Sequence, residues 1–164
     1  TTVVVGQGGG GAAAATCGAT AAATATNYDN YDAYSDQCQG VQNSSSVQIC
    51  KVKLRILNTS GAAVNFSCGI YGSKGAQQGT HYGKDVTVSV PNNLSAGIIS
   101  FEWDSDYPNP SGDYYIWCAP ATTGGHHGVK WGADSYGSTS YFLWENGYGN
   151  RTNYDLWFEV YYME

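Results

Sequence analysis

From about residue 41 onward, apolar and polar positions alternate with a period of two, as expected of half-buried β-strands. The clearest run is 50–56, where the apolar side of the alternation is Cys50, Val52, Leu54 and Ile56 and the polar side is Lys51, Lys53 and Arg55. The same alternation recurs over 64–70, 86–90, 99–103, 114–118 and 154–162, with shorter runs around 129–131 and 141–144. Turn-forming residues separate these runs, and none shows a helical stripe. The pattern therefore predicts an all-β fold, an antiparallel β-sandwich of about eight strands that we interpret as a jelly roll.

The first part of the chain has a different pattern. Ala, Gly and Thr occupy 21 of residues 1–26, and the first charged residue is Asp29. Such a segment cannot bury enough apolar surface to offset its own ordering entropy. We therefore divide the chain into an extended low-complexity arm and connector over 1–36 and a β-sandwich domain over 37–164.

Three roles are open for this arm: a flexible linker, a strand held by its own domain, or a strand that packs on a neighbouring copy. Residues 1–26 reach about 90 Å when fully extended. For the third role, Val3, Val4 and Val5 would form the apolar anchor and Cys17 would bridge to another subunit or to the body of the domain. On that hypothesis, deletion of residues 1–26 would leave a folded monomer whose melting temperature changes little.

Composition excludes several classes of protein. Only 12% of residues are charged, and the formal net charge is −6. A nucleic-acid-binding surface needs a basic patch, so we expect no nucleic acid partner. No apolar run approaches the roughly 20 residues that span a bilayer, so we expect no membrane span. The chain begins with Thr, and we expect that a leader or upstream region was removed.

The cysteines at 17, 38, 50, 68 and 118 fit an extracellular protein with disulfides. Their odd number leaves one thiol that is either unpaired or bonded between chains. Cys50, Cys68 and Cys118 have the parity of core residues, and buried apolar thiols remain an alternative for some of them. The spacing does not determine the pairing.

Groups for catalysis or metal binding are few. His126 and His127 are adjacent in a Gly-rich loop and would point to opposite faces of an extended chain. Glu102 and Glu145 are conceivable as a glycosidase pair, but no motif surrounds either. We expect no enzyme activity and no cofactor, with a structural Ca²⁺ at Asp104 and Asp106 as an open alternative.

Aromatic residues are 14% of the chain and carry the strongest signal. Parity assigns most of the following to the core: Phe101, Trp103, Tyr114, Phe142, Trp144, Tyr154 and Phe158. Those with the opposite parity, predicted to share one sheet face, are Tyr115, Trp117, Trp157 and Tyr161. A second cluster in loops would comprise Trp131, Tyr136 and Tyr148. Exposed aromatics stack on sugar rings or anchor protein interfaces, unless the arm or residues 27–36 cover them.

Asn-x-Ser/Thr triplets are candidates for glycosylation, since most lie at expected turns or strand ends. They begin at Asn43, Asn58, Asn65, Asn93 and Asn150.

Residues 37–164 resemble a loosely defined family of bacterial and phage surface modules with jelly-roll sandwiches. The matching features are Gln37, the strand from Ile49 to Ile56, Tyr114-Tyr115-Ile116-Trp117, the segment from Trp131 to Ser135, and Phe158-Glu159-Val160-Tyr161. Such modules resemble carbohydrate-binding domains and occur in phage tail and cell-surface proteins. The arm is also similar to Gly-rich stretches of phage tail-fibre proteins. The resemblance implies an extracellular location, on a cell-surface appendage or a virion.

Two functional hypotheses follow. The first is a non-enzymatic structural subunit of an extracellular filament or phage fibre, which assembles with copies of itself through the N-terminal arm. The second is a carbohydrate-binding adhesion module that uses the exposed aromatics. Self-assembly of the purified chain would favour the first, and salt-independent binding to polysaccharide would favour the second.

Overall fold

The architecture is that of a computed structural model, which describes residues 15–23, 28–33, 37–73, 79–120, 126–134, 141–145, 149–151 and 155–164. The described chain contains strands and no helix. The strands in chain order are β1 (Cys17–Ala23), β2 (Tyr28–Ala33), β3 (Gln37–Val41), β4 (Ile49–Asn58), β5 (Val64–Tyr71), β6 (His81–Val90), β7 (Leu94–Glu102), β8 (Tyr114–Pro120), β9 (His126–Asp134), β10 (Tyr141–Glu145), β11 (Gly149–Arg151), β12 (Asp155–Leu156) and β13 (Phe158–Met163). The prediction of an all-β protein is confirmed.

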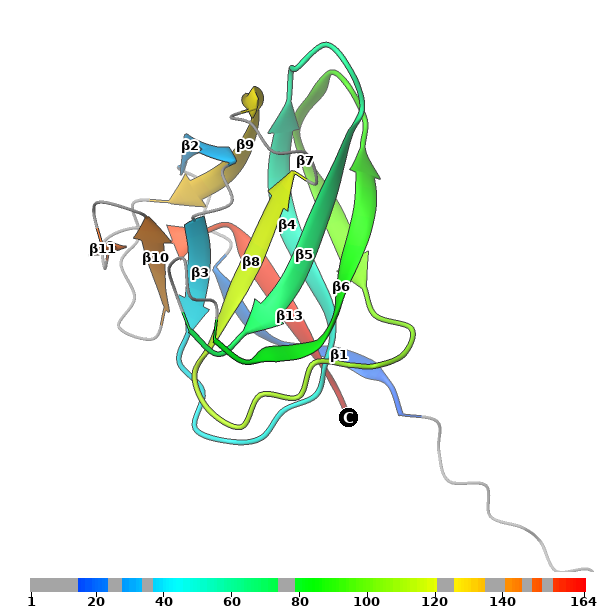
Figure 1. Ribbon diagram of the computed structural model, residues 1–164, viewed down its shortest axis with the longest axis vertical. Coiled ribbons are helices and arrows are strands. Elements are labelled where there is room, and N and C mark those ends of the chain that lie inside the picture. Colours follow the sequence, from blue (N-terminus) through cyan, green and yellow to red (C-terminus); the bar gives the residue numbers. More distant parts are fainter. Residues whose placement is uncertain are drawn as a thin grey trace, which may run out of the picture.

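The strands form two antiparallel sheets that face each other as a β-sandwich (Figure 1). One sheet has seven strands in the order β1-β13-β4-β9-β12, with β2 beside β9 and β7 beside β4. The other has six strands in the order β11-β10-β3-β8-β5-β6. No helix in the part of the chain described here is long and apolar enough to cross a bilayer.

The core lies between the two sheets and follows the alternation in the sequence. On β4, Val52, Leu54 and Ile56 are buried, whereas Lys51 and Lys53 are half-buried on the outer side. Phe66 on β5 and Phe101 on β7 are fully buried, and their ring centroids lie 6.3 Å apart across the two sheets. Burial of each such ring stabilises the fold by about 1.5–3 kcal/mol.

Polar contacts also join the two sheets. The hydroxyl groups of Tyr114 on β8 and Tyr162 on β13 lie 2.6 Å apart. At the open side of the sandwich, the indole Nε1 of Trp103 donates to the carbonyl of Lys84 at 2.6 Å. A buried tyrosine or tryptophan usually satisfies its polar atom in this way. These bonds fix how β8 and β6 sit over the other sheet.

The structure departs from the sequence-based expectation in three places. The described residues form thirteen strands where about eight were expected: β1 and β2 come from the arm and connector, β3 and β11 are additional, and the run over 154–162 is divided into β12 and β13. His126 begins strand β9 and was expected in a loop. β8 and β13 belong to different sheets, so the aromatics predicted to share one face do not share it.

Candidate functional site

The N-terminal strand is fixed to the domain by a covalent bond. β1 pairs with β13, Cys17 opposite Met163 and Ala23 opposite Phe158. A disulfide joins Cys17 to Cys50 at the start of β4, with their Cα atoms 6.0 Å apart. The backbone N–H of Glu164 donates to the carbonyl of Thr16 at 2.9 Å. Thr16, just before β1, and Glu164, just after β13, therefore lie side by side at one end of the sheet.

This geometry corrects part of the arm hypothesis. In one of the three roles left open by the sequence, residues 3–26 pack on a neighbouring subunit; residues 17–23 instead form the edge strand of their own domain. Cys17 makes the arm-to-body bridge, which was one of its two expected roles. The anchor residues Val3, Val4 and Val5 lie outside the described residues.

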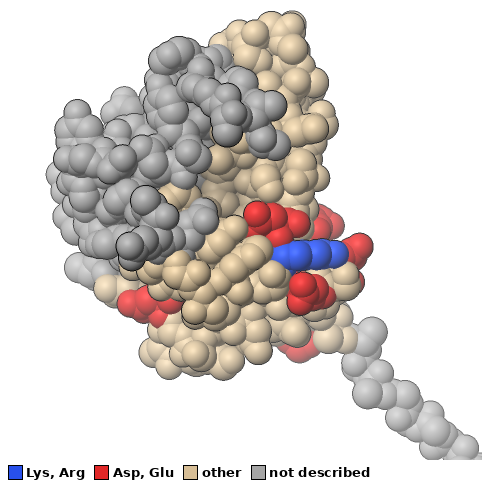
Figure 2. Space-filling view, viewed as in Figure 1, with Lys and Arg blue, Asp and Glu red and all other residues tan. Residues whose placement is uncertain are grey.

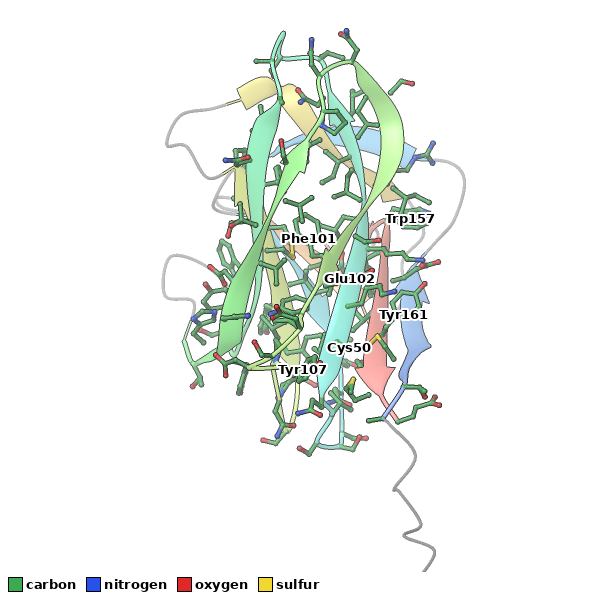
Figure 3. The ribbon with its side chains drawn as sticks, turned by 90° about the vertical axis from the view of Figure 1, so that its right-hand side faces the viewer. Cys50, Phe101, Glu102, Tyr107, Trp157 and Tyr161 are labelled. Carbon is green, nitrogen blue, oxygen red and sulfur yellow. A yellow bond between two sulfur atoms is a disulfide. The ribbon has the colours of Figure 1, made fainter. Side chains whose placement is uncertain are left out.

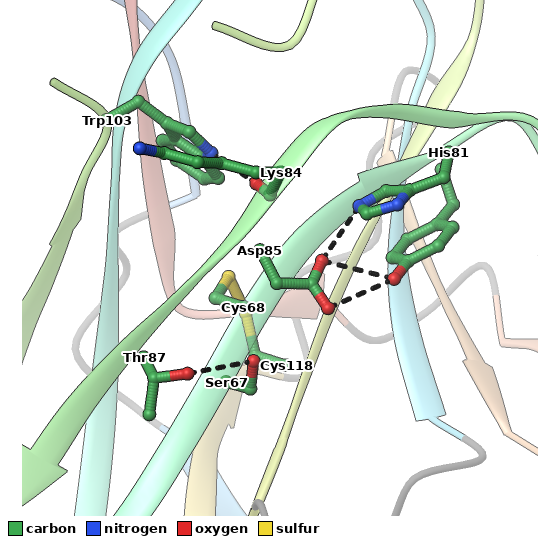
Figure 4. Close-up of a disulfide and its surroundings, with 9 residues drawn as sticks. Ser67, Cys68, His81, Lys84, Asp85, Thr87, Trp103 and Cys118 are labelled. Atoms are coloured by element: carbon green, nitrogen blue, oxygen red, sulfur yellow. Dashed lines mark hydrogen bonds and ion pairs between the residues drawn. A yellow bond between two sulfur atoms is a disulfide. The ribbon is translucent and has the colours of Figure 1, made fainter. Parts of the chain in front are cut away.

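The remaining cysteines are all buried. Cys68 on β5 and Cys118 on β8 form a second disulfide inside the six-stranded sheet (Figure 4). Cys38 on β3 belongs to neither disulfide. Two disulfides indicate an oxidising environment, which is extracellular or secreted in most organisms.

The outer face of the six-stranded sheet carries a cluster of three polar and aromatic side chains. The hydroxyl of Tyr71 on β5 donates to the carboxylate of Asp85 on β6, at 3.1 and 3.3 Å. His81 Nε2 lies 2.9 Å from Asp85 Oδ1, and the His81 ring stacks on Tyr71 with centroids 4.5 Å apart (Figure 4). Gly69 permits this arrangement, because a Cβ there would collide with Asp85 Oδ1.

Strand register extends this cluster into a row across the sheet. Tyr71 is opposite His81 on one side and Tyr115 on the other, and Trp117 is opposite Gly69. Burial, followed by the Asp85 charge, raises the pKa of Tyr71 to about 12. Burial also raises the pKa of Tyr115, with smaller contributions from Cys38 and Asp113. Both phenols are therefore neutral near pH 7, and the row presents ring surface and a carboxylate acceptor.

Charged side chains lie close to this row, and most of those on the visible face are acidic (Figure 2). In the space-filling view, acidic and basic side chains gather in a band across the lower half, and the described surface above them is uncharged (Figure 2). Lys84 contributes to this band, with its Nζ 2.7 Å from Asp104 Oδ1. The face is thus better suited to neutral ligands than to polyanions.

The aromatics predicted as an exposed set have different environments. Tyr115 is half-buried on the outer face of β8, whereas Trp117 and Trp157 are only 5% and 8% exposed. Trp117 Nε1 donates to the carbonyl of Ser73 at 3.4 Å. Trp131 is part of β9, but its side chain is not described, and Tyr136 and Tyr148 lie outside the described residues.

Tyr161 lies on the outer face of the other sheet and is covered by lysines. The Nζ atoms of Lys51 and Lys53 lie 5.1 and 4.8 Å from the centre of its ring (Figure 3). The hydrogen bond with the Tyr161 hydroxyl is the main cause of the raised pKa of Lys53. Lys51 also pairs with Glu102 at 3.2 Å and Lys53 with Glu159 at 3.5 Å. This face is occupied by its own charges, so the Tyr161 ring is not an open stacking platform.

The asparagines of the candidate glycosylation triplets also differ in how far they are buried. Asn58 is fully buried, and its Nδ2 donates to the carbonyls of Ala62, Val90 and Pro91 at 3.0 to 3.1 Å. Asn43 is half-buried and donates to the Ser45 carbonyl, whereas Asn65 and Asn93 are exposed. The side chain of Asn150 is not described. The prediction is therefore wrong at Asn58, since a glycan cannot be attached to a buried amide.

The structure places the candidate catalytic and metal groups on separate elements or in pairs with other side chains, as far as their residues are described. Asp104 is paired with Lys84 and Ser105, and that ammonium holds the pKa of the carboxyl below its usual value. Among the residues that the structure describes, no group of three His, Cys, Asp or Glu is placed to hold a metal ion. Glu102 and Glu145 lie on β7 and β10, in different sheets.

Sequence reasoning did not select Tyr71, His81 or Asp85. A signal was nevertheless present, because Tyr71 and His81 flank the connection between two alternating runs and can face each other in a hairpin. Asp85 could not be found in this way, since the register of β5 and β6 shifts between Cys68 and Ile70. No family model, curated protein or solved structure matches the chain.

Proposed function

We propose that the protein is a non-enzymatic structural subunit of an extracellular appendage, a filament or a phage fibre, that assembles with copies of itself through its N-terminal arm. One observation carries the proposal: β1, the strand that lies within the arm, is locked to the sandwich by the Cys17–Cys50 disulfide. The jelly-roll description belongs to the proposal as well, supported by strands that cross between sheets, with β4 and β7 in one and β5 and β6 in the other.

The disulfide determines which strand of the domain would bear a mechanical force applied to the arm. β1 contains only Cys, Gly, Ala and Thr, whose side chains are too small to anchor a strand by packing. Cys50 belongs to β4, which pairs with β13, β7 and β9. Tension on residues 1–14 would therefore pass through Cys17 into the centre of the seven-stranded sheet. A subunit that is held by its arm needs such an attachment.

The proposal is tested by comparing the assembly of two proteins. One is the full chain, and the other is residues 15–164, which retain β1 and the disulfide. Light scattering and negative-stain electron microscopy are expected to show regular assemblies of the full chain, whereas residues 15–164 remain monomeric. Because both chains keep the same folded domain, a difference between them reports on the arm. Equal assembly of the two, or none by either, would contradict the proposal.

The second candidate is a carbohydrate-binding adhesion module. The observation that favours it is the row of Tyr115, Tyr71 and His81 on the outer face of the six-stranded sheet, next to the Asp85 carboxylate. Ring faces stack on the C–H surfaces of sugars, and a carboxylate accepts hydrogen bonds from neighbouring hydroxyls. Neutral polysaccharide is the ligand class that this chemistry fits.

Affinity electrophoresis in gels that contain neutral polysaccharides tests this candidate. Retardation of the full chain should be lost in Tyr115→Ala and Asp85→Asn and retained in Tyr161→Ala, the matched aromatic control on the opposite sheet. Binding that all three variants retain, or no retardation of the unmodified chain in any polysaccharide, would exclude the row as the site.

A further inference from the structure

β1 is attached to its own domain by two described kinds of link, strand pairing and one disulfide. β1 lies at the edge of the sheet and pairs with β13, with a register shift between Ala19 and Ala21. Beyond the backbone hydrogen bonds of this pairing, the described link is the disulfide to Cys50. Gly18 lies beneath the end of a flexible side chain, that of Glu164. The described part of this interface consists of the backbone pairing, the disulfide and the Glu164 side chain at Gly18, groups that a β1 strand from a second copy would meet equally.

The two disulfides differ in exposure. Cys17 is exposed, although its partner Cys50 is only 4% exposed. Cys68 and Cys118 are 0% and 1% exposed. Thiol–disulfide exchange requires that a thiolate reach a sulfur atom, and exposed bonds are therefore the labile ones. In the folded domain a thiolate can therefore approach the Cys17–Cys50 bond only from the exposed Cys17, whereas both cysteines of the Cys68–Cys118 bond are buried.

We propose that β1 is an exchangeable strand, which pairs with β13 of a second copy and forms a Cys17–Cys50 disulfide between the two chains. Every copy carries both the strand and its acceptor, so the contacts seen within one chain are complementary between copies. This inference rests on the proposed function: residues 1–14 bring the copies together, so residues 15–164 alone stay monomeric, and the exchange then places β1 on the edge of β13 beside Cys50 of the neighbouring copy. An open series of such exchanges generates a fibre, and a reciprocal pair generates a dimer.

The covalent step is a balanced oxidation. Forming one disulfide from two thiols releases two electrons and two protons. With glutathione disulfide as oxidant, the Cys17 thiolate first displaces one glutathione thiolate. The partner's Cys50 thiolate then displaces the second, and two glutathione thiols are the reduced products. The same chemistry closes the bond within one chain, so the choice depends on which β1 occupies β13.

Isotopic mixing tests the exchange in the unmodified full chain. Equal amounts of ¹⁴N- and ¹⁵N-labelled protein are reduced, unfolded, mixed and refolded with glutathione and its disulfide, and any assembled fraction is isolated by size exclusion. Non-reduced peptides are then analysed by mass spectrometry. About half of the Cys17–Cys50 peptide pairs from that fraction should contain one light and one heavy member, because partners are drawn at random from an equal mixture. The Cys68–Cys118 pairs are the internal control and should be isotopically uniform.

The outcomes separate this inference from the function on which it rests. An assembled fraction whose Cys17–Cys50 pairs are isotopically uniform would overturn strand exchange and leave assembly through the arm intact. A chain that never assembles would overturn both. A second variant is the double substitution Ala21→Pro/Ala22→Pro. Successive amides of a strand point to alternate sides, so one of the two prolines removes an N–H that faces β13. This variant keeps Cys17, and we expect it to form no mixed peptide pairs.

Discussion

The side-chain amide of Asn58 donates a hydrogen bond to the carbonyl of Val90, 3.1 Å away and 32 residues later in the chain. The same amide also reaches the carbonyls of Ala62 and Pro91, and its Oδ1 accepts from the N–H and hydroxyl of Ser60. Asn58 thereby ties the turn after β4 to the turn between β6 and β7. This bond lies at the end of the sandwich opposite Cys17, so the two ends of β4 are held by different means.

Removal of the Asn58 amide should destabilise the domain strongly. Asn58→Ala leaves three carbonyls without their donor inside the protein, and we expect the free energy of unfolding to fall by about 2–4 kcal/mol. Urea denaturation of Asn58→Ala and of the exposed control Asn65→Ala measures the difference. The control should change by less than about 0.5 kcal/mol. Equal losses in the two variants would show that Asn58 does not join the turns.

Truncations should separate the contribution of residues 1–14 to stability from that of β1. Deletion of residues 1–26 removes β1 and the disulfide that closes a span of 33 residues, so stability should fall by about 3–4 kcal/mol. This reverses the expectation from sequence that the melting temperature would change little. Residues 15–164 should melt like the full chain in calorimetry, and Cys17→Ser in that background isolates the contribution of the disulfide. Melting of residues 27–164 at the full-chain temperature would contradict the role of β1.

The Tyr71 hydroxyl should ionise late. Its pKa is raised from 10 to about 12 by burial and then by Asp85, so the folded state favours the neutral phenol. The stability that follows from this is fully present below pH 10 and lost as the pH rises through about 12. Titration of phenolate absorbance should show a late-ionising group that Tyr71→Phe removes. In Asp85→Asn this group should ionise earlier but still above its ordinary value, since burial remains. An unchanged titration curve in Tyr71→Phe would refute the assignment.

The sequence was sufficient to predict the all-β fold and the buried side of a central strand such as β4. The alternation over residues 50–56 matches the observed burial of β4, because a strand between a core and solvent must alternate. Parity, however, gives the side of a strand and not its sheet. Tyr115 and Tyr161 both have outward parity, and they lie on opposite outer faces of the sandwich because β8 and β13 belong to different sheets.

The candidate sites were less predictable because they depend on contacts between distant residues. The Asn58 triplet has the pattern of a surface motif, yet its amide donates to the carbonyls of Val90 and Pro91 at the turn between β6 and β7. Cys17 and Cys50 are separated by 33 residues, and only the pairing of β1 with β13 and of β13 with β4 brings them together. Asp85 joins Tyr71 through an irregular register that no periodicity encodes.

Disulfide mapping tests most directly the central claim that the arm is rooted in the sandwich at Cys50. The oxidised full chain is alkylated before and after denaturation, digested without reduction and analysed by mass spectrometry. We predict peptides that link Cys17 to Cys50 and Cys68 to Cys118, with Cys38 alkylated only after denaturation because it is 0% exposed. A Cys17 that is alkylated in the native protein, or linked to Cys38, would contradict the claim.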